Sequence, residues 1–373
     1  MHVVNDILDI SKIEASNMDI EHIEFEPSDI IENIISSCTA LLTDKDINIR
    51  VHTAKNIPSR LIGDPLRISQ VLLNLCNNAI KFTEKGMIDI DFDYRLSKDD
   101  GYLYCTVSDT GIGLDKNKLD HIFTSFSQAD ETTSRKYGGT GLGLTIVKKL
   151  LQLMDGDISV SSTLGKGSSF KIQVKVQPVG KHNIIEPLVT NNAKIYYIPL
   201  PEHSLVSNHD FSAFGITANV IGWEQTDKLL EIKQHSCLLI DVADENSLQG
   251  KKNSIDSLLQ RNVHVAFVTD ICPKGLTTSL TKDWQLDILS HPYSPSQLTH
   301  FFISCLKAES TNNAVNVKNI KSPQKSFSGH ILLVEDNQIN QLVAGQMIEQ
   351  AGLTYDIAEN GKEAITKVCS GNT

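Results

Sequence analysis

The sequence predicts a multidomain α/β chain, with an α+β domain first, a doubly wound parallel α/β domain second and the beginning of a third α/β unit last. Three observations lead to this prediction. Helical and strand patterns mix in the first region, short apolar strands alternate with helical stretches in the second, and the polar segments 179–192 and 309–328 separate the regions. A chain of 373 residues has room for two or three domains of ordinary size.

The composition is ordinary for a soluble protein, with an acidic balance. Hydrophobic residues make up 40% of the chain, and the net charge of -11 gives no general reason to bind nucleic acid or anionic membranes. No apolar stretch reaches the ~18 residues that span a bilayer, and the N-terminus lacks the plan of a signal peptide. We therefore expect a cytoplasmic location, no nucleic-acid partner and no membrane segment in this chain, although a full-length relative could be anchored in the inner membrane.

The cysteines are scattered, mostly through apolar runs. The sequence has no CxxC motif and no other spacing typical of a metal site. We interpret all seven as reduced core residues: Cys38, Cys76, Cys105, Cys237, Cys272, Cys305 and Cys369.

The first region is expected to begin inside a helix, because apolar residues in 3–13 recur at helical spacing without an N-cap before them. A helix over roughly 28–42, a strand over 47–52 and a helix from Pro65 follow. Alternating patterns then predict two strands and a glycine-turned hairpin, with strands over 88–94, 102–108, 157–162 and 168–176. Together these elements form one predicted α+β domain, 25–178.

The second region, 193–308, reads as a parallel sheet covered on both faces, because helical stretches separate its short strands. The expected strands are 194–198, 218–221, 237–242, 263–269 and 287–289. The last region, 329–373, starts with an apolar strand that ends in Glu335 and Asp336, followed by helix, strand and the start of another helix.

Two glycine-rich turns in the first region point to a nucleotide. One is Asp109-Thr110-Gly111-Ile112-Gly113, and the other, Gly138-Gly139-Thr140-Gly141-Leu142-Gly143-Leu144, opens a helical stretch. Glycine lets the backbone approach a ligand closely, and the amides at a helix N-terminus suit phosphate. Turns and helix caps also use glycine, so neither loop is specific by itself.

The helix from Pro65 adds a polar stripe at the edge of its apolar face. Asn74, Asn78 and Lys81 are spaced at i, i+4 and i+7, which places them side by side. A solvated helix face is the usual explanation of such a stripe. Asparagine is a poor helix former, however, and its amide oxygen suits magnesium, while a lysine suits a terminal phosphate.

Four motifs in this order resemble those of histidine kinases. Residues 74–83 look like the N box, 109–113 like the G1 box, 122–126 like the F box and 139–144 like the G2 box. The resemblance covers essentially the whole of 25–178. It implies the Bergerat (GHKL) ATP-binding fold, an α+β sandwich in which a mobile lid covers the nucleotide.

The resemblance also implies a role for each matching residue. Asn78, helped by Asn74, would hold the Mg²⁺ on ATP, Lys81 would contact the phosphates, and Asp109 would accept from the adenine amino group. The same motifs place further residues around ATP: Phe82, Gly111, Gly113, Gly139, Thr140, Gly141, Leu142 and Gly143. Asp109 is also a common turn residue after a strand, and Phe123 of the F box could equally be plain core.

Residues 1–24 are similar to the C-terminal end of the second helix of a histidine-kinase dimerisation domain. The first helix of such a domain carries the phosphorylated histidine, and none of the twelve histidines here has that sequence context. We therefore expect a chain truncated at both ends, which binds Mg-ATP but does not phosphorylate itself on the usual histidine. The implied partners are a dimerising kinase helix and a response-regulator or phosphotransfer protein.

Residues 329–373 resemble the start of a receiver domain. Glu335 and Asp336 end its first strand, where paired carboxylates can bind Mg²⁺ for phosphoryl transfer, although acids at a strand end can also be caps. The phospho-accepting aspartate would lie past Thr373. We therefore expect this receiver to be incomplete.

Residues 193–308 look like a degenerate receiver. Asp241 matches the acceptor position and Thr269 the switch hydroxyl, but the acid pair is absent, and His291 replaces the lysine expected before Pro292. Without acids to hold Mg²⁺, the charge on a transferring phosphoryl group is not neutralised. We therefore interpret Asp241 as a structural or vestigial residue rather than a phospho-acceptor.

The resemblance favours the catalytic core of a hybrid sensor histidine kinase, which transfers the γ-phosphoryl group of ATP to histidine and then to aspartate in a two-component phosphorelay. Two alternatives stay open. One is a GHKL ATPase of the chaperone or mismatch-repair kind. The other is a non-catalytic ATP-binding regulatory fragment.

Overall fold

The fold is given by a computed structural model, in which the chain divides into two units, Met1–Ser310 and Thr311–Thr373. Within the described residues, no helix combines the length and the apolar composition that a membrane span requires. The structure describes residues 11, 13, 18–42, 45–97, 100–119, 121–124, 142–188, 194–201, 204–225, 232, 236–243, 245–248, 250–270, 284, 286–307, 329–335, 341, 344–345, 348 and 352–369.

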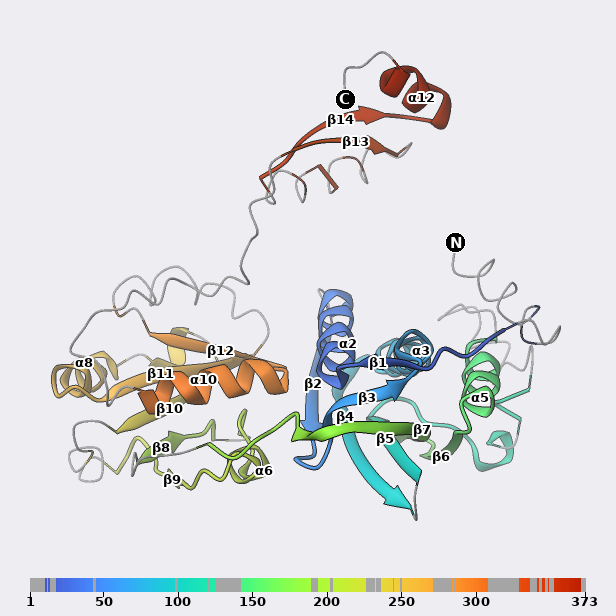
Figure 1. The fold of residues 1–373 in the computed structure, drawn as a ribbon. Coiled ribbons are helices and arrows are strands. Elements are labelled where there is room, and N and C mark those ends of the chain that lie inside the picture. Colours follow the sequence, from blue (N-terminus) through green and yellow to red (C-terminus); the bar gives the residue numbers. More distant parts are fainter. Residues whose placement is uncertain are drawn as a thin grey trace. The chain divides into compact units, whose positions relative to one another are not determined.

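The first domain is built on a seven-stranded sheet with helices packed on it (Figure 1). Its order is β1-β3-β7-β5-β4-β2, and β6 also pairs with β7. Strand β7 holds the sheet together, because it pairs with β6 along its first part, with β3 along its last part and with β5 along its other edge. The strands are β1 (Ile23–Phe25), β2 (Asp46–Thr53), β3 (Pro58–Gly63), β4 (Lys85–Ser97), β5 (Asp100–Asp109), β6 (Asp157–Thr163) and β7 (Gly167–Asn183).

Three helices cover this sheet: α2 (Pro27–Leu41), α3 (Pro65–Phe82) and α5 (Gly143–Leu153). Both α2 and α3 start with a proline in their first turn, where the missing N–H costs no hydrogen bond. The side chain of Asp64 caps α3 by accepting from the backbone N–H of Arg67 at 2.9 Å. These local signals fix where α3 begins and therefore which of its residues face the core.

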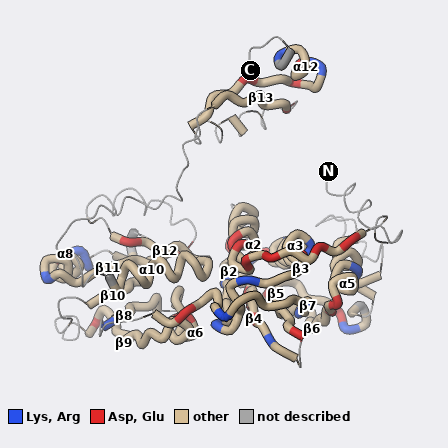
Figure 2. The backbone as a smooth tube through the Cα atoms, in the orientation of Figure 1, with Lys and Arg blue, Asp and Glu red and all other residues tan. Residues whose placement is uncertain are grey.

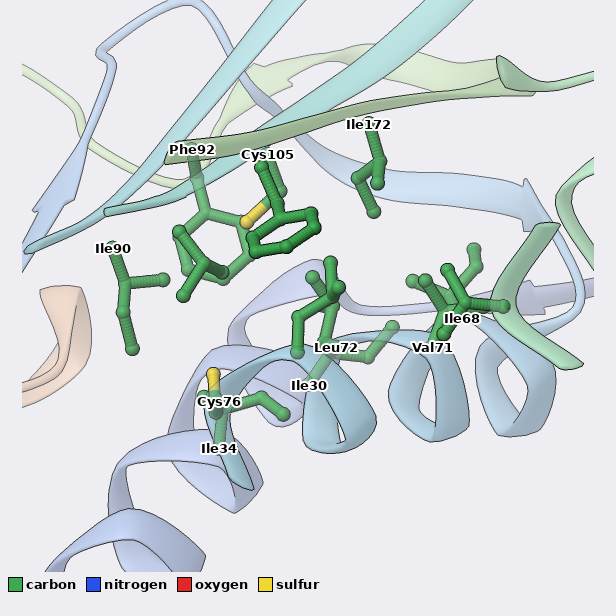
Figure 3. Close-up of a cluster of buried hydrophobic side chains, with 14 of the residues drawn as sticks. Ile30, Ile34, Ile68, Val71, Leu72, Cys76, Ile90, Phe92, Cys105 and Ile172 are labelled. Carbon is green, nitrogen blue, oxygen red and sulfur yellow. The ribbon is translucent and has the colours of Figure 1, made fainter. Parts of the chain in front are cut away.

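The core of the first domain lies between the helices and the sheet (Figure 3). Ile34 of α2 and Leu72 of α3 are both buried there. Phe92, Cys105 and Ile172 meet them from three strands of the sheet. Burial of this apolar face leaves the neighbouring polar stripe of α3 at the edge of the core.

The second domain is a five-stranded parallel sheet of order β12-β11-β10-β8-β9, with helices on both faces. Its central strand β10 is buried along its whole length, and successive residues point into two different cores, with Leu239 in one and Leu238 and Ile240 in the other. The elements are β8 (Ile195–Ile198), α6 (Asn208–Ala213), β9 (Ala218–Val220), β10 (Cys237–Val242), α8 (Lys252–Gln260), β11 (His264–Asp270), β12 (Asp287–His291) and α10 (Pro295–Lys307), with a short 3₁₀ turn at Glu245–Leu248; the other 3₁₀ turn, Lys116–Lys118, belongs to the first domain.

The second unit contains a parallel pair of strands and a helix. Strand β13 (His330–Val334) pairs with β14 (Thr354–Ala358), and α12 (Gly361–Cys369) follows. Asn360 caps this helix by accepting from the backbone N–H of Glu363 at 2.9 Å.

The predicted fold class is confirmed. The sequence pattern does not predict β1 and β3, and the predicted end of the first domain, residue 178, lies before the end of β7. Strand β7 runs to Asn183, into the segment 179–192 that the sequence predicts as a linker. Pro178 and Gly180 give this end of β7 the composition of a loop, yet it pairs with β3, a strand that itself lacks an alternating pattern. Acidic and basic positions are interspersed along both domains (Figure 2), in keeping with a net charge of -11 spread over the chain.

Candidate nucleotide-binding site

The polar stripe of α3 lies at the edge of the first domain's core, as its spacing predicts. Asn74, Asn78 and Lys81 are half-buried, whereas the neighbouring Asn77 is exposed. The Lys81 ammonium lies 5.0 Å from the centre of the Phe82 ring, and burial lowers the pKa of Lys81. Two amide groups and one ammonium group are therefore held at a surface where a ligand can reach them.

Asp109 is the last residue of β5 and begins the first glycine loop. One of its carboxylate oxygens, Oδ1, accepts from the backbone N–H of Gly111 at 2.8 Å. Burial raises the pKa of Asp109, against backbone N–H groups of Gly111 and Ser168 that lower it. The carboxylate is thus oriented by its own loop and partly withdrawn from water.

The first glycine loop lies against the C-terminal end of α3. The backbone N–H of Ile112 donates to the carbonyl of Phe82 at 3.2 Å. A Cβ atom on Gly111 would lie 2.4 Å from that same carbonyl oxygen, so only glycine fits there. The structure therefore brings two motifs together that are almost thirty residues apart in the sequence.

Gly113 closes the loop onto the β6–β7 hairpin. Its φ of +67° is in the left-handed region, and a Cβ atom would lie 2.1 Å from the carbonyl oxygen of Thr163. On the hairpin side, the N–H of Gly165 donates to the carbonyl of Ile112 at 2.7 Å. The loop after Asp109 is consequently held on both sides by backbone.

The second glycine motif ends beside the asparagines of α3. Gly143 is the first residue of α5, and a Cβ atom on it would lie 3.6 Å from Oδ1 of Asn74. Among the residues that the structure describes, no side chain caps the N-terminus of α5, which follows the buried Leu142. The amide oxygen of Asn74 and the start of α5 are therefore neighbours. Gly139, Thr140 and Gly141 lie outside the described residues.

The F box is represented by Phe123, which is half-buried against the core of the first domain. Its carbonyl accepts from the hydroxyl of Thr145 at 3.2 Å, and the Lys148 ammonium lies 5.3 Å from the centre of its ring. Both partners belong to α5, so Phe123 connects the F box to the helix that the second glycine motif opens.

The carboxylate pair expected in the last region is described only in part. Glu335 follows β13; its N–H donates to the carbonyl of Ala358 at 3.0 Å, and its carbonyl accepts from Gln341 at 2.7 Å. Asp336 lies outside the described residues. The Mg²⁺ site at Glu335 and Asp336 thus stays a prediction.

Asp241 of the second domain is buried, and its carboxylate accepts hydrogen bonds from neighbouring segments. It is 4% exposed, and its Oδ2 accepts from the hydroxyl of Tyr197 at 2.5 Å and from the N–H of Leu205 at 2.8 Å. Tyr197, whose pKa is raised first of all by burial, also accepts from the N–H of Val206 at 3.0 Å. The sequence shows that β8 lacks acids, but it does not predict that Tyr197 of this strand donates a hydrogen bond to Asp241. The available signal was the pair Tyr196 and Tyr197 inside an otherwise apolar strand.

Comparisons with known proteins support the resemblance of the motifs to those of histidine kinases. Residues 63–178 match the family described as Histidine kinase-, DNA gyrase B-, and HSP90-like ATPase. The chain is 39% identical over 376 residues to the Signal transduction histidine-protein kinase BarA of Escherichia coli (strain K12), an alignment that covers 98% of this chain and 40% of BarA. It is 29% identical over 431 residues to Histidine kinase 5 of Arabidopsis thaliana, covering 100% of this chain and 44% of that protein. The chain thus spans less than half the length of these curated relatives.

A solved structure shares the fold. The crystal structure of full-length ShkA in complex with AMPPNP matches with a TM-score of 0.61 and 23% sequence identity, covering 98% of this chain and 73% of ShkA. The likeness extends over both domains of the first unit. The family match shows that residues 63–178 carry this ATPase-type domain, and the relatives show that the chain is similar to histidine kinases over nearly its whole length.

Proposed function

We propose that the first domain binds Mg-ATP and transfers its γ-phosphoryl group to a histidine, as the catalytic core of a cytoplasmic two-component phosphorelay. The observation that carries the proposal is the meeting of three motifs around the end of α3. Asn74 lies beside Gly143, the first residue of α5, and the carbonyl of Phe82 accepts a hydrogen bond from the N–H of Ile112 in the first glycine loop. The asparagines of α3, the first glycine loop and the N-terminus of α5 therefore border one region. A structural role for each motif alone would not require them to converge.

Asp109 is suited to recognise adenine. A carboxylate accepts from an exocyclic amino group, and here the N–H of Gly111 fixes one of its oxygens in place. Because Gly111 and Gly113 have no side chains, the loop stays close enough to α3 and to the hairpin to keep Asp109 at the edge of the region. The carboxylate would hold the base, and the stripe of α3 would meet the phosphates.

The residues on α3 fit a magnesium–triphosphate group. Amide oxygens are hard ligands of the kind Mg²⁺ takes, and the amide oxygen of Asn74 lies next to position 143, where a Cβ atom would be 3.6 Å from it. Asn78 and Asn74 would hold the ion, which neutralises charge on the triphosphate when bound. Lys81 and the uncapped N–H groups at the start of α5 would contact phosphate oxygens.

The acceptor histidine would be presented by a dimerisation helix of a histidine kinase, and the phosphoryl group would pass on to a response-regulator or phosphotransfer protein. The site in the first domain would position the γ-phosphoryl group, and the dimerisation helix would present the acceptor histidine to it. Most of the protein's catalytic contribution would be orientation and charge stabilisation.

The test is to incubate the chain with γ-labelled ATP and a separately produced histidine-kinase dimerisation segment. Label on the histidine of that segment is the expected result. Hydrolysis of ATP without labelled segment would support a GHKL ATPase instead, and binding of ATP with neither reaction would support a regulatory fragment.

Two asparagine variants make this test specific. Asn78→Ala is expected to abolish labelling, because it removes the proposed Mg²⁺ ligand. Asn77→Ala changes an exposed asparagine on the same helix and is expected to retain labelling. Equal activity of the two variants would contradict the site.

A further inference from the structure

Three neighbouring strands of the second domain begin with side chains that can bind a metal. Cys237 is the first residue of β10, His264 of β11 and Asp287 of β12. Since these strands are adjacent and parallel, their first residues gather at one edge of the sheet. This edge is the opposite one from Asp241, near the end of β10, so it lies away from the receiver-like acceptor position.

A second thiol reaches the same edge from α10. Ligand atoms of Cys237, His264 and Cys305 all lie within 4.8 Å of one another. Zinc–sulfur and zinc–nitrogen bonds of about 2.3 and 2.0 Å place tetrahedral ligands about 3.5 Å apart. The three side chains would therefore have to approach by only about 1 Å to share an ion.

Asp287 completes the set. Its Oδ2 lies 3.0 Å from Nε2 of His264, an ion pair when the imidazole is protonated. A nitrogen and a carboxylate oxygen at this separation are also close to the spacing of two ligands on one small ion, which would take the imidazole in its deprotonated form. The hydroxyl of Ser304 donates to the same carboxylate at 2.8 Å and orients it.

The surroundings suit a buried structural ion with access from solvent. Both cysteines are buried, whereas the side chains of His264 and Asp287 are 25% and 38% exposed. Thiolates select Zn²⁺ over the hard cations that the asparagines of the first domain suit. Sequence spacing concealed this group, because its members come from four separate elements.

We propose that Cys237, His264 and Cys305 bind one Zn²⁺ ion, with the carboxylate of Asp287 as the fourth ligand. Binding releases the thiol protons to solvent and ties α10 to the edge of the sheet. The site is independent of the proposed kinase activity and of Asp241. It would stabilise the second domain rather than take part in phosphoryl transfer.

The test uses the full chain, reduced and freed of metal with a chelator, and titrated with Co²⁺. We expect one equivalent to give the strong visible absorption of tetrahedral Co²⁺ together with a thiolate charge-transfer band, and Zn²⁺ to remove both. Co²⁺ on the amide oxygens of the first domain would give neither signal. Absence of the thiolate band would overturn the proposal, as would a Cys237–Cys305 disulfide in protein purified without reductant.

Variants identify the ligands. Cys305→Ser is expected to weaken the thiolate-to-Co²⁺ band, because only the thiolate of Cys237 remains, and Asp287→Asn to weaken Co²⁺ binding about 10- to 100-fold. His264→Gln provides a partly exposed position for the case in which Cys305→Ser does not fold, and it should weaken Co²⁺ binding as well. Cys38→Ser is the matched control, because Cys38 is a buried thiol hydrogen-bonded to another cysteine, Cys76, in the first domain. Unchanged Co²⁺ spectra in both His264→Gln and Asp287→Asn would contradict the ligand set.

Discussion

Asp109 and Asp241 are both aspartates near the end of a central strand, and they differ in what surrounds their carboxylates. Asp109 is half-buried, and the N–H of Gly111 in the following loop orients one of its oxygens. Asp241 is 4% exposed, and its Oδ2 accepts from both Tyr197 and Leu205. The same residue type at a similar place is thus half-buried and oriented by a glycine loop in one domain, where we propose that it binds adenine, and enclosed by the fold in the other.

The difference follows from the residues that come next. After Asp109 the chain supplies glycines, which add backbone donors but no side chain to cover the carboxylate. Around Asp241 the chain supplies a tyrosine from β8 and the backbone of a neighbouring segment, which replace water as partners. A carboxylate that is buried and hydrogen-bonded by buried donors stabilises the domain but has little nucleophilic use.

The largest effect is expected from removing the buried carboxylate. Asp241→Ala leaves the hydroxyl of Tyr197 and the N–H of Leu205 without their acceptor, and should lower the free energy of unfolding by about 3 kcal/mol. Both tryptophans of the chain, Trp223 and Trp284, belong to this domain, so urea unfolding followed by tryptophan fluorescence reports on it selectively. Asp270→Ala, at a side chain that is 40% exposed, is the control and should cost less than about 1 kcal/mol. Similar losses in the two variants would mean that the buried network contributes little.

The next effect concerns the glycine loop that keeps Asp109 available. Gly113→Ala introduces a Cβ atom 2.1 Å from a backbone oxygen at a φ of +67°, and should destabilise the first domain by about 2 to 3 kcal/mol. Gly165→Ala has a φ of +76° but no atom within 4 Å, so it isolates the cost of the left-handed conformation, about 1 kcal/mol. Thermal unfolding followed by circular dichroism measures both. If Gly165→Ala were as destabilising as Gly113→Ala, the close contact with the hairpin would not matter.

A smaller loss is expected from Tyr197→Phe, which removes one hydroxyl and keeps the ring. The carboxylate of Asp241 retains its bond from Leu205, but the N–H of Val206 loses its acceptor, so the free energy of unfolding should fall by about 1 to 2 kcal/mol. Combining this change with Asp241→Ala in a double-mutant cycle should give a total loss smaller than the sum, because both changes remove the same bond. Strict additivity would show that the two groups act independently.

The last prediction, with the smallest expected effect, is that Asp241 is not phosphorylated. Acetyl phosphate and Mg²⁺ should place no phosphoryl group on Asp241, since the carboxylate is enclosed and the acid pair of a receiver is absent from β8. Intact-mass measurement after incubation tests this directly. A phosphoaspartate mapped to Asp241 would contradict the structural role that we assign to this residue.

Much of this organisation follows from local pattern in the sequence. The apolar stripe and proline start of α3 are sufficient to predict which side of that helix carries Asn74, Asn78 and Lys81. The central strands β10 and β11 of the second domain stand out because parallel strands buried on both faces are short, largely apolar runs.

The features that escaped prediction depend on contacts between distant segments. Strand β3 and the end of β7 have little strand pattern of their own and are stabilised by pairing with each other. The hydrogen bond from Tyr197 to Asp241, and the cluster of Cys237, His264 and Cys305, join residues whose separation in the sequence carries no recognisable spacing. Such contacts depend on the order of the strands in each sheet, and local sequence patterns do not reveal that order.

The most direct test of the nucleotide site is a calorimetric titration of Mg-ATP into the chain and into Asp109→Asn and Asp241→Asn. Loss of a charged hydrogen bond to adenine should weaken binding about 10- to 100-fold in Asp109→Asn. Asp241→Asn should bind Mg-ATP as the unchanged chain does, because its carboxylate belongs to the other domain. Unchanged affinity in Asp109→Asn would contradict the assignment of Asp109 to the adenine base.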